Sequence, residues 1–135
     1  MDSETRSYRT GDREVVVDLT SEAEEFVASC GGGDGLLSLF VPHATCGIAV
    51  IETGAGSDDD LLAALGDLLP ADDRWRHRHG SRGHGRSHVM PAIVPPHATV
   101  PVVGGRLALG TWQSLCLVDL NVDNDVREVR YSLLT

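Results

Sequence analysis

The sequence predicts a β-rich α+β fold with about eight mostly antiparallel strands and two short helices. Short apolar segments rich in β-branched residues recur between turn residues along most of the chain, which is typical of strands. Two other segments place their apolar residues at helical spacing. The chain has 135 residues, a length at which a single domain can bury a core of its own. We therefore expect residues 1–135 to form one domain.

Eight segments account for the expected strands. Two lie within residues 5–20, on either side of a turn at Gly11-Asp12. Another two, residues 99–103 and 106–109, flank Gly104-Gly105, and a two-residue glycine turn between strands is a strong hairpin signal. The other four strands are expected at residues 36–41, 47–51, 113–120 and 126–133.

Two helices are expected between these strands. The first follows Ser21, which forms a capping-box pattern with Glu24, and ends at the glycines of residues 31–33. The second covers residues 58–69 and ends at Pro70. Its first turn carries three aspartates, Asp58, Asp59 and Asp60. Capping and the helix dipole explain such carboxylates, and a role for them in a site stays open.

The charge is distributed unevenly along the chain. The net charge of −9 argues against a general binder of nucleic acid or anionic membranes. Residues 1–73 hold 16 of the 20 acidic residues, whereas residues 74–118 hold six arginines, five of the six histidines and no Asp or Glu. A carboxylate-free segment rich in arginine and histidine, within an acidic protein, indicates a local site for an anion or a metal.

The sequence shows no segment that directs the protein to a membrane and no cysteine motif that indicates a disulfide or a zinc site. No apolar run approaches the roughly 20 residues that cross a bilayer, and the N-terminal residues do not resemble a signal peptide, so we expect a cytoplasmic protein without a membrane partner. The three cysteines, Cys30, Cys46 and Cys116, form no CxxC pair, which argues against a disulfide framework or a thiolate zinc site. A cysteine nucleophile stays open, although buried structural cysteines are commoner.

The histidines are the main candidates for chemistry, because imidazole is the commonest metal ligand and titrates near neutral pH. His43 stands at a strand end between two apolar runs, and His88 opens an apolar segment. Residues at the ends of regular elements are good candidates for a converging site. The spacing of His77, His79, His84 and His88 matches no zinc-finger pattern. For His79 and His84 we favour a polar, mobile loop.

Arginines alternate with these histidines at positions 74, 76, 78, 82 and 86. Guanidinium groups form charge-assisted bonds to phosphate, so Arg76 and Arg82 are candidate substrate-binding residues. RNA binding is a rival interpretation, weakened by an aromatic content of only 4%, which leaves few stacking platforms. A solvated arginine loop is a third possibility.

Two segments resemble a known family. Residues 105–113, Gly-Arg-Leu-Ala-Leu-Gly-Thr-Trp-Gln, followed by an apolar strand that ends in Val118-Asp119, resemble the C-terminal signature of the YjbQ family. The segment from His43 to Glu52 resembles the HTTAGLTINE-type segment of that family, and His77 and His88 follow in the expected order. The resemblance covers about residues 36–120. It implies a YjbQ-like sandwich that assembles as a homotrimer, with a site near the subunit contacts.

The family is described as secondary thiamine-phosphate synthase, a transferase. The resemblance therefore implies transfer of a pyrimidine-methyl group from its pyrophosphate to a thiazole phosphate, and whether this is a side activity stays open. It implies catalytic roles for His43, His77 and His88. The other implied residues are Asp60 and Gln113 in catalysis and Thr111 and Trp112, with the arginines above, in binding the phosphorylated small-molecule substrate.

The three catalytic histidines are also the expected metal ligands. Three neutral imidazoles with water suit zinc, whereas mixed carboxylate and water ligation suits magnesium. The alternative to a transferase is a non-catalytic trimeric protein that binds a metal or a phosphorylated metabolite.

Overall fold

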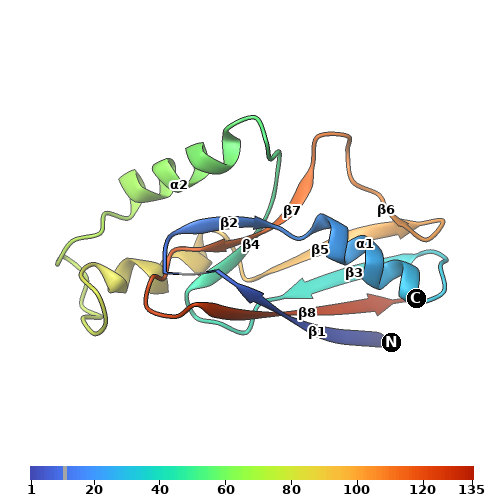
Figure 1. Cartoon of the computed structure of the whole chain (residues 1–135), viewed down its shortest axis with the longest axis horizontal. Coiled ribbons are helices and arrows are strands. Elements are labelled where there is room, and N and C mark those ends of the chain that lie inside the picture. Colours follow the sequence, from blue (N-terminus) through green and yellow to red (C-terminus); the bar gives the residue numbers. More distant parts are fainter. Residues whose placement is uncertain (11) are drawn as a thin grey trace.

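The chain folds into two antiparallel sheets, shown in Figure 1 by a computed structural model that describes residues 1–10 and 12–135. The larger sheet has the strand order β1-β8-β3-β5-β6 and the smaller one β2-β7-β4. The strands are β1 (Asp2–Arg9), β2 (Val15–Asp18), β3 (Gly35–Phe40), β4 (Cys46–Ile51), β5 (His97–Val103), β6 (Arg106–Leu107), β7 (Ser114–Asp119) and β8 (Val126–Leu134). The predicted β-rich fold with eight strands is confirmed.

The pairing of the strands differs from the simple hairpin order at the N-terminus. β1 pairs with β8 and β2 pairs with β7, so the first two strands enter different sheets. Gly11, where a turn was expected, lies outside the described residues. The hairpin of β5 and β6 is confirmed, and Gly104 and Gly105 at its turn have φ of 57° and 76°, which a glycine adopts without strain.

The main core lies between the two sheets. In β8, Val129, Tyr131 and Leu133 are buried while their neighbours Glu128 and Arg130 are exposed. A shift of this strand by one residue would exchange the two sets, so the alternation fixes its register between β1 and β3. Leu37 and Leu39 of β3, Val100 and Val102 of β5, Ile48 of β4, and Leu115 and Leu117 of β7 complete the core between the sheets.

Strand β7 is buried on both faces. Leu115 and Leu117 face the core between the sheets, whereas Val118 belongs to a second apolar cluster with Leu65, Leu69, Met90 and Leu120. Its nearly continuous apolar sequence reflects this position, because a strand covered on both faces has no solvent side.

The two predicted helices are confirmed as α1 (Thr20–Ser29) and α2 (Ser57–Leu68). α1 contacts β6 and β8 of one sheet and β7 of the other, and it buries Ala23, Phe26 and Val27 in the main core. The expected capping box is wrong, because the helix begins before Ser21 and has no side-chain cap of that kind. Asp18 accepts a hydrogen bond from the backbone N–H of Thr20 instead. Among the described helices, none combines the length and the apolar character that crossing a bilayer requires.

The segment rich in arginine and histidine connects α2 to β5. It consists of turns over residues 70–83, followed by two short 3-10 helices, η1 (His84–His88) and η2 (Met90–Ala92). Trp75 anchors it by donating its indole N–H to the carbonyl of Pro70 at 2.8 Å. The buried Arg86 donates to the carbonyl of Leu69 at 3.1 Å and pairs with Glu14. These contacts give the segment a defined path at one end of the molecule.

Gly47 in β4 provides a test of how this segment packs. A Cβ at this position would overlap the carbonyl of Val94, while the neighbouring Ile48 N–H donates to Pro95 at 2.8 Å. We predict that Gly47→Ala lowers the free energy of unfolding by about 1–3 kcal/mol, because backbone must move to admit the methyl group. Chemical denaturation measures this. Gly66→Ala in α2 is the matched control, since no atom lies near its added Cβ. Equal stability of the two variants would contradict the packing.

The cysteines provide a second test. Burial raises the pKa of Cys46 and Cys116 to about 12, so both remain neutral thiols at pH 8.5 and lack the reactive thiolate. We predict that iodoacetamide at this pH modifies the half-buried Cys30 first and leaves the other two unmodified until denaturant is added. Peptide mass spectrometry distinguishes the sites. Modification of Cys46 in the folded protein as fast as in the denatured chain would restore it as a candidate nucleophile.

Candidate functional site

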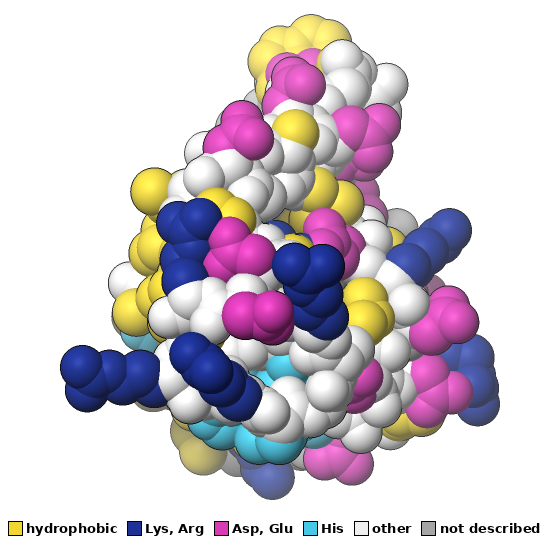
Figure 2. All heavy atoms as spheres, turned by 90° about the vertical axis from the view of Figure 1, so that its left-hand side faces the viewer, with side chains coloured by type: hydrophobic (Ala, Val, Ile, Leu, Met, Phe, Trp, Pro, Cys, Tyr) yellow, Lys and Arg dark blue, Asp and Glu magenta, His cyan; other side chains and the backbone are white. Residues whose placement is uncertain are grey.

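Four histidines converge in the segment between α2 and β5. His77 and His79 come from the turns before η1, while His84 and His88 are its first and last residues. One ring nitrogen of each lies within 4.8 Å of the corresponding nitrogens of the others. The Nε2 atoms of His84 and His88 are 2.9 Å apart, and those of His77 and His79 are in contact. Figure 2 shows the histidine side chains gathered in one patch of the surface, bordered by arginines. We call these four residues the histidine cluster.

Glycine allows this convergence. A Cβ at Gly85 would overlap the carbonyl oxygen of His77 and the side chain of Trp75. Only glycine therefore lets η1 pack directly against the backbone of the turn region that carries His77. This close approach places the first and last residues of η1 beside His77, whose ring centroid lies 4.0 Å from that of His88.

The ring of His84 is held by a carboxylate from another part of the chain. Its Nδ1 lies 2.8 Å from Oδ2 of Asp123, in the connection between β7 and β8. The backbone N–H and the hydroxyl of Ser81 both donate to the same carboxylate at 3.1 Å, and the hydrogen bond from the backbone lowers the pKa of Asp123. This contact at Nδ1 leaves Nε2 on the side of the cluster, 2.9 Å from Nε2 of His88. Metal-binding histidines are commonly held in this way.

The cluster favours neutral imidazoles. Burial lowers the pKa of His77 and of His88, and the neighbouring imidazoles lower it further. Where two Nε2 atoms face each other, one ring can donate its N–H to the other, or both nitrogens can bind a shared cation. The donor set fits such an ion, because neutral imidazole is a preferred ligand of zinc, copper and nickel.

A hollow of about 360 Å³ adjoins the cluster. One side is formed by His79, His84 and His88, and the other by residues from the connections β3–β4 and β7–β8. The residues from the connections are His43, Ala44, Thr45, Asn121, Asp123 and Asn124, and Arg127, the second residue of β8, joins them. The cluster therefore stands at the edge of a space large enough for a small molecule.

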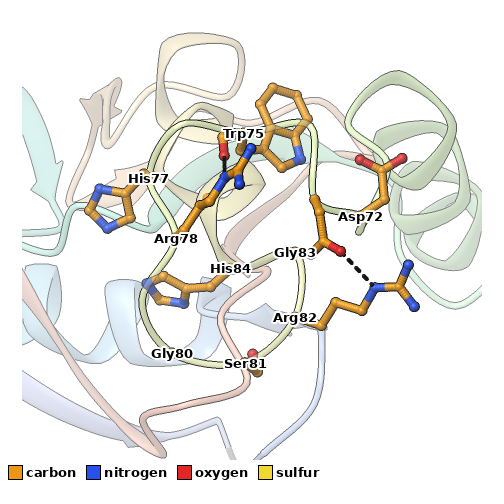
Figure 3. A pocket seen from close by; sticks show the side chains of 11 residues that line it. Asp72, Trp75, His77, Arg78, Gly80, Ser81, Arg82, Gly83 and His84 are labelled. Atoms are coloured by element: carbon orange, nitrogen blue, oxygen red, sulfur yellow. Dashed lines mark hydrogen bonds and ion pairs between the residues drawn. The ribbon is translucent and has the colours of Figure 1, made fainter.

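A second hollow, of about 340 Å³, is enclosed by the segment itself. His77 and His84 line one side of it, with Arg82 opposite them in Figure 3. Arg82 is exposed and its ion pair with Asp73 measures 3.8 Å. Its guanidinium is therefore free to turn toward an anion at the mouth of this hollow.

The structure brings together some of the residues expected from the sequence. His77 and His88 belong to the histidine cluster. His43 does not, but it lines the larger hollow together with His88. Its Nε2 accepts a hydrogen bond from the backbone N–H of Glu128 at 2.9 Å. Burial and then the positive charge of Arg127 lower the pKa of His43, so the ring is neutral and carries its proton on Nδ1.

The other expected residues lie elsewhere in the chain. Asp60 is exposed in the first turn of α2, and Arg76 is exposed without lining either hollow described above. Gln113 accepts a hydrogen bond from the N–H of Gly110 at 2.8 Å, which closes the turn before β7. Thr111 and Trp112 belong to the same turn, and Figure 1 shows the connection of β6 and β7 well apart from the segment between α2 and β5.

Sequence reasoning missed two histidines and one carboxylate of this site. The interpretation of His84 as a side chain of a mobile loop is wrong, because His84 is 8% exposed and contacts Asp123. His79 is exposed but points its Nε2 into the cluster. The spacing of four residues between His84 and His88, with Gly83 and Gly85 on either side of His84, was the available signal. No sequence signal pointed to Asp123, because only the fold brings its carboxylate to His84.

Comparison with known proteins agrees with this architecture. A family model described as "UPF0047 protein YjbQ-like" matches residues 4–135. The UPF0047 protein Rv2556c of Mycobacterium tuberculosis is 54% identical over 134 residues, which cover 99% of this chain and 98% of that protein. The UPF0047 protein YugU of Bacillus subtilis is 33% identical over 116 residues, covering 82% and 83%.

Solved structures share the fold. The hypothetical protein APE1520 of Aeropyrum pernix superposes with a TM-score of 0.89 at 32% identity, covering 99% of this chain and 98% of that one. A YbjQ-like protein of unknown function from Sulfolobus solfataricus gives 0.91 at 24% identity, covering 98% and 95%. The strand arrangement predicted from the resemblance is thus confirmed, and the chain belongs to the YjbQ-like UPF0047 family.

Proposed function

We propose that the chain binds one zinc-class divalent cation in the histidine cluster and acts on a phosphorylated small molecule in the adjoining hollow. The supporting observation is the convergence of four ring nitrogens within 4.8 Å at the edge of a hollow of about 360 Å³. The ligands proposed are His77 and His88 together with His79 and His84. His43 lies outside this group, and we assign it to the substrate side.

The donor set distinguishes between the two metals that the sequence left open. Magnesium prefers oxygen ligands, and the carboxylate that contacts the cluster, that of Asp123, is already engaged by Ser81 and His84. Nitrogen ligands suit zinc or another transition metal. The composition of the cluster therefore favours a zinc-class ion over magnesium.

The proposed reaction is that of a thiamine-phosphate-synthase-like transferase. The bond between the methyl carbon of the pyrimidine and the pyrophosphate oxygen breaks, and its electron pair leaves with pyrophosphate. The carbon bonds to the thiazole nitrogen. Negative charge therefore grows on the leaving group, and a cation of the zinc class, when bound, supplies Lewis acidity that stabilises charge on phosphoryl oxygens.

The side chains around the two hollows support such a step. His43 carries its proton on Nδ1 and can donate a hydrogen bond to an oxygen of the leaving group, where it stabilises the growing negative charge. Arg82, at the mouth of the smaller hollow, can add positive charge. Both residues act by stabilising the phosphate groups rather than the ring systems.

The remaining expected residues require a further proposal. Asp60, Arg76, Thr111, Trp112 and Gln113 do not line the larger hollow within one chain. We propose that they meet a site only across the subunit contacts of a homotrimer. The ring of Trp112 supports this, because it is 73% exposed and a large apolar side chain in that position commonly marks a contact surface.

One observation favours the alternative of a non-catalytic binding protein. Four imidazoles fill the four positions that zinc usually takes, and closed sites of this kind are typical of structural rather than catalytic zinc. A cluster that holds a metal without leaving a position for substrate would serve storage, sensing or assembly. The two experiments below separate the two functions.

The first experiment measures the metal. We predict about one zinc ion per chain by elemental analysis after dialysis, and loss of affinity beyond about 10–100-fold in His88→Ala, since removal of a ligand should exceed the cost of removing a supporting residue. His97→Ala is the control, because His97 is exposed in β5 and outside the cluster. Equal zinc affinity in wild type and His88→Ala would refute the site.

The second experiment measures the reaction. The purified protein is mixed with both phosphorylated precursors, and thiamine phosphate is quantified by chromatography. We predict product from the wild type and the His97→Ala control, and none above background from a His77→Ala, His88→Ala double variant. If wild type and double variant form the same trace of product while only the wild type binds zinc, the binding-protein alternative replaces the transferase.

A further inference from the structure

The wall of the larger hollow opposite the histidine cluster contains a buried arginine. Arg127 forms an ion pair with Asp119, in which Nε donates to Oδ2 at 2.8 Å, and the two side chains are 4% and 0% exposed. Its Nη1 donates to the carbonyl of Val126 at 3.3 Å. Its Nη2 is buried and has no hydrogen-bond partner among the described residues. Buried donors are nearly always satisfied, so this N–H is available to an acceptor that a ligand brings.

The other polar groups of this wall are also donors. The proton of His43 resides on Nδ1, because Glu128 N–H occupies Nε2. Asn121 accepts the N–H of Asp123 through Oδ1 at 2.8 Å, and its amide nitrogen lies 3.4 Å from the hydroxyl of Thr45. The orientation of this amide is therefore fixed, with its NH2 group on the side of Thr45.

Two carboxylates near this wall already have partners. Asp119 accepts from Arg127 and, through Oδ1, from the N–H of Asn121 at 2.9 Å. Asp123 accepts from Ser81 and contacts His84. A wall whose buried side chains offer N–H donors, beside a buried carboxylate of Asp119 that is already paired through both oxygens, matches a ligand that brings acceptors. An oxyanion meets this description, and guanidinium binds phosphate oxygens particularly well.

We propose that His43, Asn121 and Arg127 form a binding subsite for a phosphate group, facing the histidine cluster across the hollow. The inference rests on the proposed function in that the phosphate would belong to its substrate. It differs from the sequence-based expectation, in which the exposed Arg76 and Arg82 were the phosphate ligands. Buried donors held by fixed partners bind an anion with less loss of side-chain freedom than exposed arginines do.

The test uses inorganic phosphate and pyrophosphate with the full chain, both metal-free and loaded with one equivalent of zinc. Isothermal titration calorimetry measures the affinity. We expect His43→Ala to weaken binding at least 10-fold while the zinc stoichiometry stays that of wild type. His97→Ala should change neither quantity. A subsite made of surface charge alone would respond to Arg82→Ala and not to His43→Ala.

Arg127 needs a paired variant, because its removal alone leaves the buried Asp119 without a partner. Asp119→Asn with Arg127→Gln removes both charges and retains groups that can hydrogen-bond to each other. We expect this variant to lose phosphate binding. A titration of wild-type protein monitored by NMR covers the case that it does not fold. In this titration, phosphate should shift the NMR signals of the Glu128 backbone amide and of the Asn121 side-chain amide.

The outcomes separate this inference from the proposed function. Phosphate binding that depends on His43 in a protein that takes up no zinc would support the subsite and refute the metal centre. One zinc ion per chain without phosphate binding, or with phosphate binding unchanged in His43→Ala, would support the metal centre and refute the subsite. Phosphate-induced shifts confined to residues 74–82 would also overturn the subsite.

Discussion

The site depends on four imidazoles whose ring nitrogens converge on one small space. Where two of these nitrogens face each other they need a shared proton or a shared cation, because two lone pairs repel, and the Nε2 atoms of His84 and His88 lie only 2.9 Å apart. The surrounding structure is built to hold this arrangement. Gly85 admits the backbone of His77, and Asp123 holds the outer nitrogen of His84. A metal ion bound there as proposed would be held by these nitrogens, and its binding energy would add to the stability of the fold.

The connection between β7 and β8 joins this site to the core. Asp119 ends a strand that is buried on both faces, and it pairs with Arg127 at the start of β8. Between them, Asn121 and Asp123 reach the hollow and the cluster. The histidine cluster, which belongs to an otherwise irregular segment, is thus positioned by groups attached to the two sheets. Sites supported in this way hold their geometry better than loops alone.

The sequence predicted the elements of the fold because their signals are local. Alternation in β8, helical spacing in α2 and the glycine pair at the β5–β6 turn each lie within a few residues. The site was predicted only in part. His77 and His88 were found, but His84 was assigned to a mobile loop, because its burial depends on Asp123, which is 39 residues away in the sequence. Such long-range contacts have no local pattern. The sheet that each N-terminal strand joins was equally beyond the sequence.

X-ray absorption spectroscopy of the zinc-loaded protein tests the central claim most directly, because it counts the ligands and identifies their type. The account predicts a first shell of nitrogen at the zinc–imidazole distance of about 2.0–2.1 Å, with the outer-shell scattering of four imidazole rings. A first shell that contains sulfur, or that fits oxygen with no more than one imidazole, would contradict it.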